Sequence, residues 1–157
     1  MLKKLKPILI SVAIALAVGG LSALLTKDSM NIYEEINTPS FAPPGWLFPI
    51  VWTILFTLMG IGSGIVYKKK DLFPAISEKG LIIYGISLIF NFLWSIIFFN
   101  MRAFLFSFIW LLVLIVLVII YSSLFYKVDK KAGLIQIPYI IWIIFAAVLN
   151  YAIFIMN

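Results

Sequence analysis

The chain has 157 residues, of which 64% are hydrophobic and 11% are charged, and its mean hydropathy is +1.17. A soluble domain is about half apolar and about a quarter charged, and one of this size could not bury so much apolar surface. We therefore expect most of that surface to face lipid. Cysteine and histidine are absent, which excludes disulfides, thiolate nucleophiles and metal sites built from these side chains. The net charge of +6 is explained by lysines flanking apolar segments, so no nucleic-acid partner is expected.

Five apolar stretches are long enough to cross a bilayer, which takes about 20 helical residues. They lie near residues 8–25, 46–67, 81–100, 103–126 and 134–156. The first follows three lysines, as a signal peptide would, but it is long for one and four more spans follow, which favours a retained helix. We predict an all-α, multi-pass protein of the cell membrane, with residues 1–157 forming a single five-helix transmembrane domain.

The lysines predict the orientation of these spans. Ten of the twelve basic residues fall in loops on one side of the membrane, whereas Lys27 and Arg102 fall on the other. By the positive-inside rule the N-terminus is cytoplasmic. The longest loop, residues 26–45, and the tight turn at residues 100–102 then lie outside. The deep parts of the spans carry no charged residue, which argues against a pump or an ion-coupled carrier.

The segment around the start of the second span combines prolines with aromatic residues. Pro43 and Pro44 form a stiff approach to the helix, and Trp46 suits an aromatic anchor at the membrane interface. Trp52 lies about 9 Å deeper by helical rise and shares a face with Phe56. These two rings predict one wall of an aromatic pocket, with ordinary helix packing as the alternative.

The third and fifth spans carry buried polar and aromatic residues at helical spacing. Asn91 and Trp94 lie on neighbouring faces, and Asn91 is expected to hydrogen-bond another helix, with a ligand contact as the second possibility. Trp142, Ala146 and Asn150 form one stripe, in which a large ring beside a small residue leaves a notch for a ligand or for another helix.

Small residues recur in the first two spans. They occur at positions 15, 19 and 23 and at positions 60 and 64, a spacing that allows helices to approach closely. The contact lies either within one chain or across a dimer. The fourth span is uniformly rich in leucine, isoleucine and valine, which predicts a surface facing lipid or a partner subunit.

Three motifs together resemble the TspO/translocator-protein (peripheral-type benzodiazepine receptor) family. They are PSFAPPGW at residues 39–46 with its continuation to residue 60, NFLWS at residues 91–95 followed by Phe98 and Phe99, and the pattern of the fifth span from residue 132 to residue 151. They occur in the family's order and in the matching spans, so the resemblance covers nearly the whole chain.

The resemblance implies a five-helix bundle, often a homodimer, with a ligand cavity beneath the loop after the first helix. It also implies a porphyrin or a drug-like apolar molecule as ligand, light-dependent oxidative porphyrin degradation, and no obligatory cofactor. Trp52 and Trp142 would be the photochemical residues. The candidate ligand contacts are Tyr33, Pro43, Pro44, Trp46, Phe48, Trp52, Phe56, Asn91, Trp94, Trp142, Phe145 and Ala146.

One departure concerns sterols. The family's proposed cholesterol motif places a basic residue after Leu-x-Tyr in the fifth helix, and residues 152–157 contain none, which argues against sterol binding. Two other functions remain open for the chain: a transporter of porphyrins or similar apolar compounds, and a non-catalytic sensor that reports ligand occupancy to a partner. The absence of a general acid, a general base and metal ligands argues against conventional hydrolysis or group transfer.

Overall fold

The computed structural model describes residues 1–29 and 31–157; Met30, within the predicted loop 26–45, lies outside the described residues. Two short elements are a 3₁₀ turn at Lys27–Ser29 and a π-helical segment at Ile96–Asn100. The α-helices are α1 (Leu2–Thr26), α2 (Ile32–Glu35), α3 (Leu47–Lys68), α4 (Pro74–Ser95), α5 (Phe104–Val128), α6 (Lys130–Leu134) and α7 (Ile137–Met156).

Five helical stretches of the described chain are long and apolar enough to cross a membrane, which confirms the predicted all-α membrane architecture. Some helices extend beyond the apolar stretches. α1 begins at Leu2 because lysine is a good helix former and its charge can reach water from the helix end. α4 begins at Pro74 because proline is favoured in the first turn of a helix.

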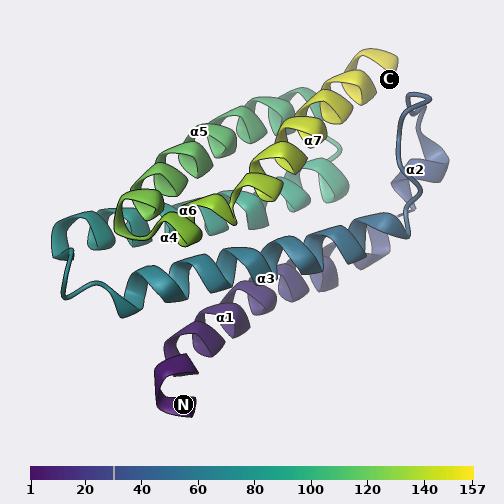
Figure 1. The fold of residues 1–157 in the computed structure, drawn as a ribbon. Coiled ribbons are helices and arrows are strands. Elements are labelled where there is room, and N and C mark those ends of the chain that lie inside the picture. Colours follow the sequence, from purple (N-terminus) through teal and green to yellow (C-terminus); the bar gives the residue numbers. More distant parts are fainter. Residues whose placement is uncertain (30) are drawn as a thin grey trace.

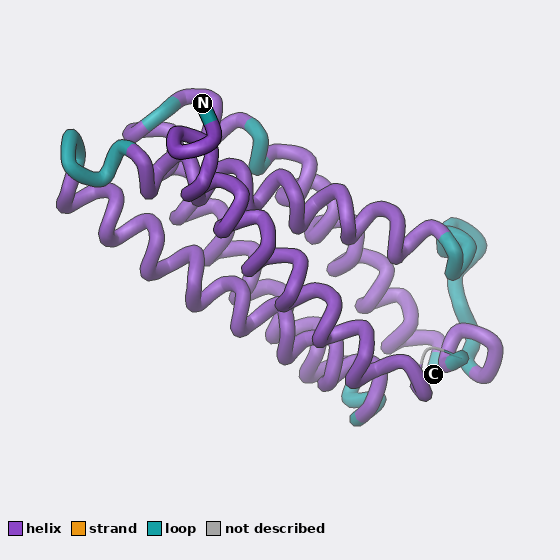
Figure 2. The backbone as a smooth tube through the Cα atoms, turned by 90° about the horizontal axis from the view of Figure 1, so that it is seen from below, coloured by secondary structure: helices purple, strands orange, loops and turns teal. Residues whose placement is uncertain are grey.

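The axes of the five spans run roughly parallel to one another (Figures 1 and 2). α1 packs against α3 and α4, α5 packs against α4 and α7, and α3 meets α6 and α7. α5 therefore buries one stripe between α4 and α7, whereas its other face is exposed to the surroundings, as a lipid-facing surface requires.

The contact between α1 and α3 depends on two glycines of α3. A Cβ atom at Gly60 would lie 2.4 Å from the Cα atom of Val12, and one at Gly64 would lie 2.5 Å from the Cα atom of Ile8. The two backbones thus approach more closely than any side chain would allow. This small-residue motif joins two helices of one chain.

The ends of the bundle differ in charge. The N-terminus, the α3–α4 connection and the α5–α6 turn lie at one end, and they carry the ten clustered lysines (Figure 1). The α1–α3 loop, the α4–α5 turn and the C-terminus lie at the other end. This distribution is the one that the positive-inside rule needs, and the cytoplasmic position of the lysine-rich end stays a prediction.

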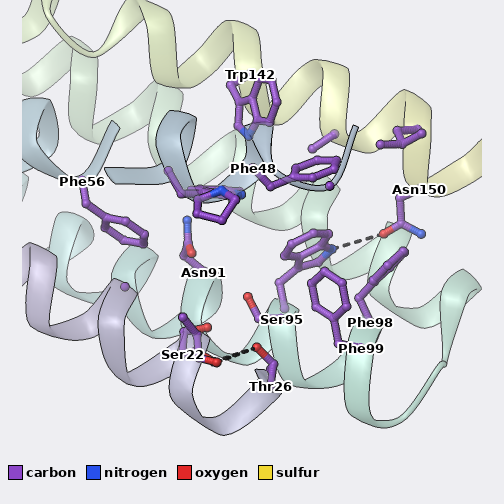
Figure 3. Close-up of a pocket in the computed structure, with 18 of the residues that line it drawn as sticks. Ser22, Thr26, Phe48, Phe56, Asn91, Ser95, Phe98, Phe99, Trp142 and Asn150 are labelled. Carbon is purple, nitrogen blue, oxygen red and sulfur yellow. Dashed lines mark hydrogen bonds between the residues drawn. The ribbon is translucent and has the colours of Figure 1, made fainter. Parts of the chain in front are cut away.

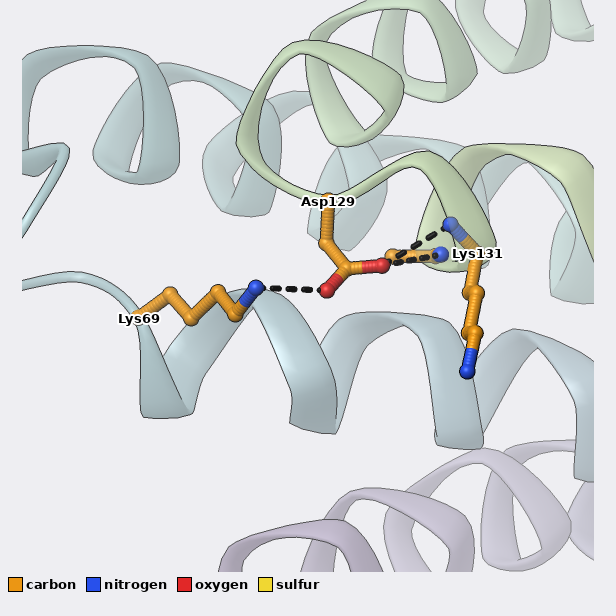
Figure 4. Close-up of polar contacts among 4 residues, drawn as sticks. Lys69, Asp129 and Lys131 are labelled. Carbon is orange, nitrogen blue, oxygen red and sulfur yellow. Dashed lines mark hydrogen bonds and ion pairs between the residues drawn. The ribbon is translucent and has the colours of Figure 1, made fainter.

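A partly exposed turn with several polar contacts lies at the lysine-rich end (Figure 4). Lys69 donates to Asp129 Oδ2 over 2.6 Å, and Asp129 Oδ1 accepts hydrogen bonds from the backbone N–H groups of Lys131 and Ala132 at the start of α6. The hydrogen bond from Lys69 lowers the pKa of the Asp129 carboxyl below its ordinary value, and the two backbone hydrogen bonds act in the same direction. Because Asp129 caps α6, Lys130 and Lys131 are helical rather than part of the loop that the sequence suggested.

Candidate functional site

A cavity of about 290 Å³ lies inside the bundle, at the end opposite the clustered lysines (Figure 3). α1, α3, α4 and α7 supply its walls, and the α1–α3 loop covers it. Its lining residues are Gly19, Ser22, Ala23, Thr26, Tyr33, Gly45, Phe48, Pro49, Trp52, Phe56, Asn91, Trp94, Ser95, Phe98, Phe99, Trp142, Ala146, Leu149 and Asn150.

Three indole rings from three helices meet in this cavity. The ring of Trp52 lies 6.4 Å from the ring of Trp94 and 6.4 Å from the ring of Trp142, measured between centroids. The Trp52 and Trp142 planes are perpendicular, at 89°. Phe56 lies 5.7 Å from Trp52 and packs over Gly19, where a Cβ atom would come within 2.6 Å of the phenyl ring. The first helix therefore needs a glycine at this level to admit the aromatic wall.

The stripe on α7 faces the cavity along its length. Trp142, Ala146 and Asn150 all belong to the lining, so the notch predicted above Ala146 opens into the cavity. The Trp142 indole nitrogen is buried and has no hydrogen-bond partner within the described part of the chain. A buried N–H group left unpaired costs about 1–3 kcal/mol. A ligand that presents an acceptor to this nitrogen would recover that cost.

Hydrogen bonds between helices hold the polar side chains of the site. Asn91 donates to the Tyr139 hydroxyl over 2.7 Å, so it bonds another helix as predicted, and the structure identifies that helix as α7. Asn150 Oδ1 accepts from the Trp94 indole N–H over 3.1 Å and from the Ser107 hydroxyl over 3.0 Å. Asn150 thus fixes the rotamer of Trp94 while joining α4, α5 and α7.

The loop over the cavity contacts the bundle at three points. Tyr33 on α2 stacks on Phe48, with ring centroids 5.4 Å apart. Glu35, two residues later, forms an ion pair with Arg102 in the α4–α5 turn. Asn37 exchanges hydrogen bonds with Asn157 at the end of α7. The cover is therefore held by surface contacts, while its aromatic side chain forms part of the cavity wall.

Eight of the twelve candidate ligand contacts come together in the lining. They are Tyr33, Phe48, Trp52, Phe56, Asn91, Trp94, Trp142 and Ala146.

Four candidates lie outside the lining. Pro43 and Pro44 belong to the segment that leads into α3, and Trp46 is 68% exposed at the N-cap of that helix, as an interfacial anchor would be. Phe145 packs behind Trp142, with ring centroids 5.4 Å apart, and also meets Phe41 of the covering loop. Its role is to support the Trp142 ring.

The structure adds lining residues that were not among the candidate ligand contacts. Gly19 and Ala23 belong to the small-residue pattern of the first span, and that pattern was the available signal for them. Phe98 and Phe99 are placed by the π-helical segment, where the Met101 N–H donates to the Ile96 carbonyl over 3.0 Å. The sequence around these phenylalanines gives no sign of a π-helical turn.

The lining, as far as the structure describes it, consists of aromatic rings, small residues, hydroxyls and amides, with no ionisable acid or base from Asp, Glu, Lys or Arg. Such a surface stacks on a planar apolar ligand and orients it through a few hydrogen bonds.

Comparison with known proteins gives a consistent result. Residues 11–156 match the TspO/MBR family. The chain is 33% identical to the tryptophan-rich protein TspO of Chlorobaculum tepidum, over 99% of this chain and 98% of the relative. It is 34% identical to the tryptophan-rich protein TspO of Archaeoglobus fulgidus, over 94% of each, and 29% identical to the human translocator protein, over 84% of this chain and 78% of the relative. This five-span membrane protein therefore belongs to the TspO/MBR family.

Proposed function

We propose that the cavity binds a tetrapyrrole of the protoporphyrin class and that the bound porphyrin is oxidatively degraded in light. The observation that carries this proposal is the convergence of Trp52, Trp94 and Trp142 in one apolar cavity. Stacked and edge-on indoles favour a broad aromatic disc, and the unpaired Trp142 N–H favours a ligand with acceptor atoms. Flat apolar drugs of the benzodiazepine type satisfy the same requirements.

The size of the cavity implies how a porphyrin would enter. A volume of about 290 Å³ is near the lower limit of small-molecule sites, about 300–1,000 Å³, and a substituted macrocycle needs more room than a small drug. We therefore expect the covering loop with Tyr33 to move outward when porphyrin binds.

The photochemical part of the proposal uses the two perpendicular indoles. A porphyrin excited by light takes one electron from Trp52 or Trp142, which leaves an indole radical cation and a reduced porphyrin. Dioxygen takes the electron from the reduced porphyrin and becomes superoxide. The indole radical cation then takes one electron back from the macrocycle, and superoxide attacks the oxidised macrocycle held against the same rings. In this scheme the protein positions the ligand and relays one electron, and the ligand supplies the excited state.

The test is an absorption titration of the detergent-purified protein with protoporphyrin IX in the dark, followed by illumination. We expect saturable binding in the dark and loss of the porphyrin band in light. The double variant Trp52→Phe/Trp142→Phe should lose most of the light-dependent step. Trp110→Phe is the matched control, because Trp110 stacks on Phe90 away from the cavity.

Each possible outcome bears on a different part of the proposal. Unchanged porphyrin loss in the double variant would refute the role of the two indoles. Binding without protein-dependent loss would refute the degradation step and favour a carrier, which flux into sealed vesicles would detect, or a sensor. No saturable binding would refute the ligand assignment.

A further inference from the structure

A second hollow lies on the lateral surface near the lysine-rich end, away from the central cavity. It is a groove of about 350 Å³ between the last turns of α5 and the α6–α7 junction. Apolar side chains form much of its surface, and several of them are half exposed: Ile119 is 46%, Leu134 is 51% and Ile137 is 45% accessible. In a membrane-spanning bundle, such a surface faces the acyl chains of the lipid.

A close crossing of two helices produces this groove. A Cβ atom at Gly133 would lie 2.5 Å from Tyr126 Cβ and 2.8 Å from the Tyr126 backbone nitrogen. α6 therefore crosses the end of α5 with no side chain between the backbones. The rest of the groove opens beside this crossing, along the start of α7.

Two polar groups give the groove a chemical preference. Ser122 is 6% exposed, and its hydroxyl is buried without a hydrogen-bond partner among residues 1–29 and 31–157. This hydroxyl can donate to an ester or phosphate oxygen. Lys127 lines the groove one and a half turns further along α5, at the level where the helix reaches the membrane surface, and its long stem lets the ammonium reach a headgroup.

The charge of this end selects the kind of headgroup. It carries ten lysines against three carboxylates, those of Asp71, Glu78 and Asp129, and Asp129 is already paired with Lys69. A membrane surface beside so many lysines enriches anionic lipids, and each nearby lysine contributes about 1 kcal/mol to that attraction.

We propose that this groove binds one anionic phospholipid from the leaflet at the lysine-rich end. One acyl chain lies along the apolar side chains, the phosphate meets the Lys127 ammonium, and the Ser122 hydroxyl donates to an oxygen of the glycerol ester region. The site is independent of the central cavity and of the function proposed for it.

The test is native mass spectrometry of the full chain released from detergent with equimolar dioleoyl phosphatidylglycerol and dioleoyl phosphatidylcholine. We expect the wild type to retain one phosphatidylglycerol in preference to phosphatidylcholine. Lys127→Gln should reduce that preference about fivefold, the equivalent of about 1 kcal/mol. Lys79→Gln is the matched control, because it removes the same charge at the same end of the bundle but outside the groove, and it should change the preference less than twofold.

A second variant tests the apolar part of the site. Ile137→Trp should fill the groove and reduce retention of both lipids, and circular dichroism checks that each variant is folded. Equal retention of the two lipids by the wild type would overturn the proposal. Equal effects of Lys127→Gln and Lys79→Gln would also overturn it, since they would show a general charge effect. A lipid-free dimer in the mass spectrum would overturn the proposal as well, since it would indicate that a second copy of the chain covers the groove.

Discussion

Replacing Gly60 with alanine tests the close contact between α1 and α3. The new Cβ atom would lie 2.4 Å from Val12 Cα, whereas ordinary contacts begin near 3.4 Å, so the two helices must separate by about 1 Å. The obstructing atoms belong to a backbone and cannot turn aside as a side chain can. Overpacking of this kind costs about 1–3 kcal/mol, and the better helix propensity of alanine offsets about 1 kcal/mol. We therefore expect Gly60→Ala to lower the free energy of unfolding by up to about 2 kcal/mol, and to be about 1–3 kcal/mol less stable than a variant that gains only the helix propensity of alanine.

Gly85→Ala provides the matched control on another spanning helix. A Cβ atom at Gly85 meets no atom of the described residues within 4 Å, so only helix propensity changes, and the variant should be as stable as the wild type or up to about 1 kcal/mol more stable. The assay is unfolding by sodium dodecyl sulfate in mixed micelles, followed by far-ultraviolet circular dichroism. If both variants were equally stable, the close packing of α1 on α3 would be refuted.

The same displacement of α1 should weaken ligand binding. Gly19 and Ser22 on α1 line the cavity opposite α7, and a shift of about 1 Å would separate that wall from the aromatic rings. A titration with protoporphyrin IX should show weaker binding for Gly60→Ala and unchanged binding for Gly85→Ala. Unchanged binding by a destabilised Gly60→Ala variant would show that α1 is not a rigid wall of the site.

Three further predictions concern other contacts. Asn150→Leu should lower the free energy of unfolding by about 1–2 kcal/mol in the same detergent assay, because the Trp94 indole and the Ser107 hydroxyl lose their acceptor; unchanged stability would contradict this role. The hydrogen bond from Lys69 lowers the pKa of Asp129 in the folded protein. An unfolded aspartate titrates near pH 4, so the stabilisation from this carboxylate is complete above about pH 4 and is lost as the pH falls further. Thermal melts of the wild type should therefore fall more steeply below about pH 4 than those of Asp129→Asn, and parallel curves would refute the assignment. Arg102→Gln should release Glu35 and so increase the ligand dissociation rate, measured by stopped flow, at least twofold. The free energy of unfolding should change by less than about 1 kcal/mol, as is usual for an exposed ion pair. An unchanged dissociation rate would show that this ion pair does not hold the covering loop in place.

Hydropathy was sufficient to locate the spans, because a lipid-facing helix must be apolar along its whole length. Helical spacing was sufficient to place Trp142, Ala146 and Asn150 on one face. The sequence left open what that face meets, since a neighbouring helix and a ligand cavity both accept a large ring beside a small residue. In the structure that face lines an empty space among four helices, and a ligand in that space stays a prediction.

Other parts of the site depend on backbone conformation and long-range contacts, which the local sequence does not predict. The π-helical turn that places Phe98 and Phe99 occurs in an apolar run with no proline or glycine to mark it. The glycine pattern predicted close helix contact but could not distinguish a contact within the chain from one between subunits. The cover over the cavity depends on an ion pair between residues 67 positions apart, Glu35 and Arg102.

Arg102 has a backbone φ of 51°, a left-handed conformation that is unfavourable for a residue with a side chain by roughly 1–2 kcal/mol. Glycine would adopt the same turn without that penalty, but it would lack the guanidinium that holds Glu35. Arg102→Gly would relieve the turn of that cost and would also remove the ion pair with Glu35. The cost of the left-handed backbone at Arg102 therefore accompanies the contact that joins the α4–α5 turn to the covering loop.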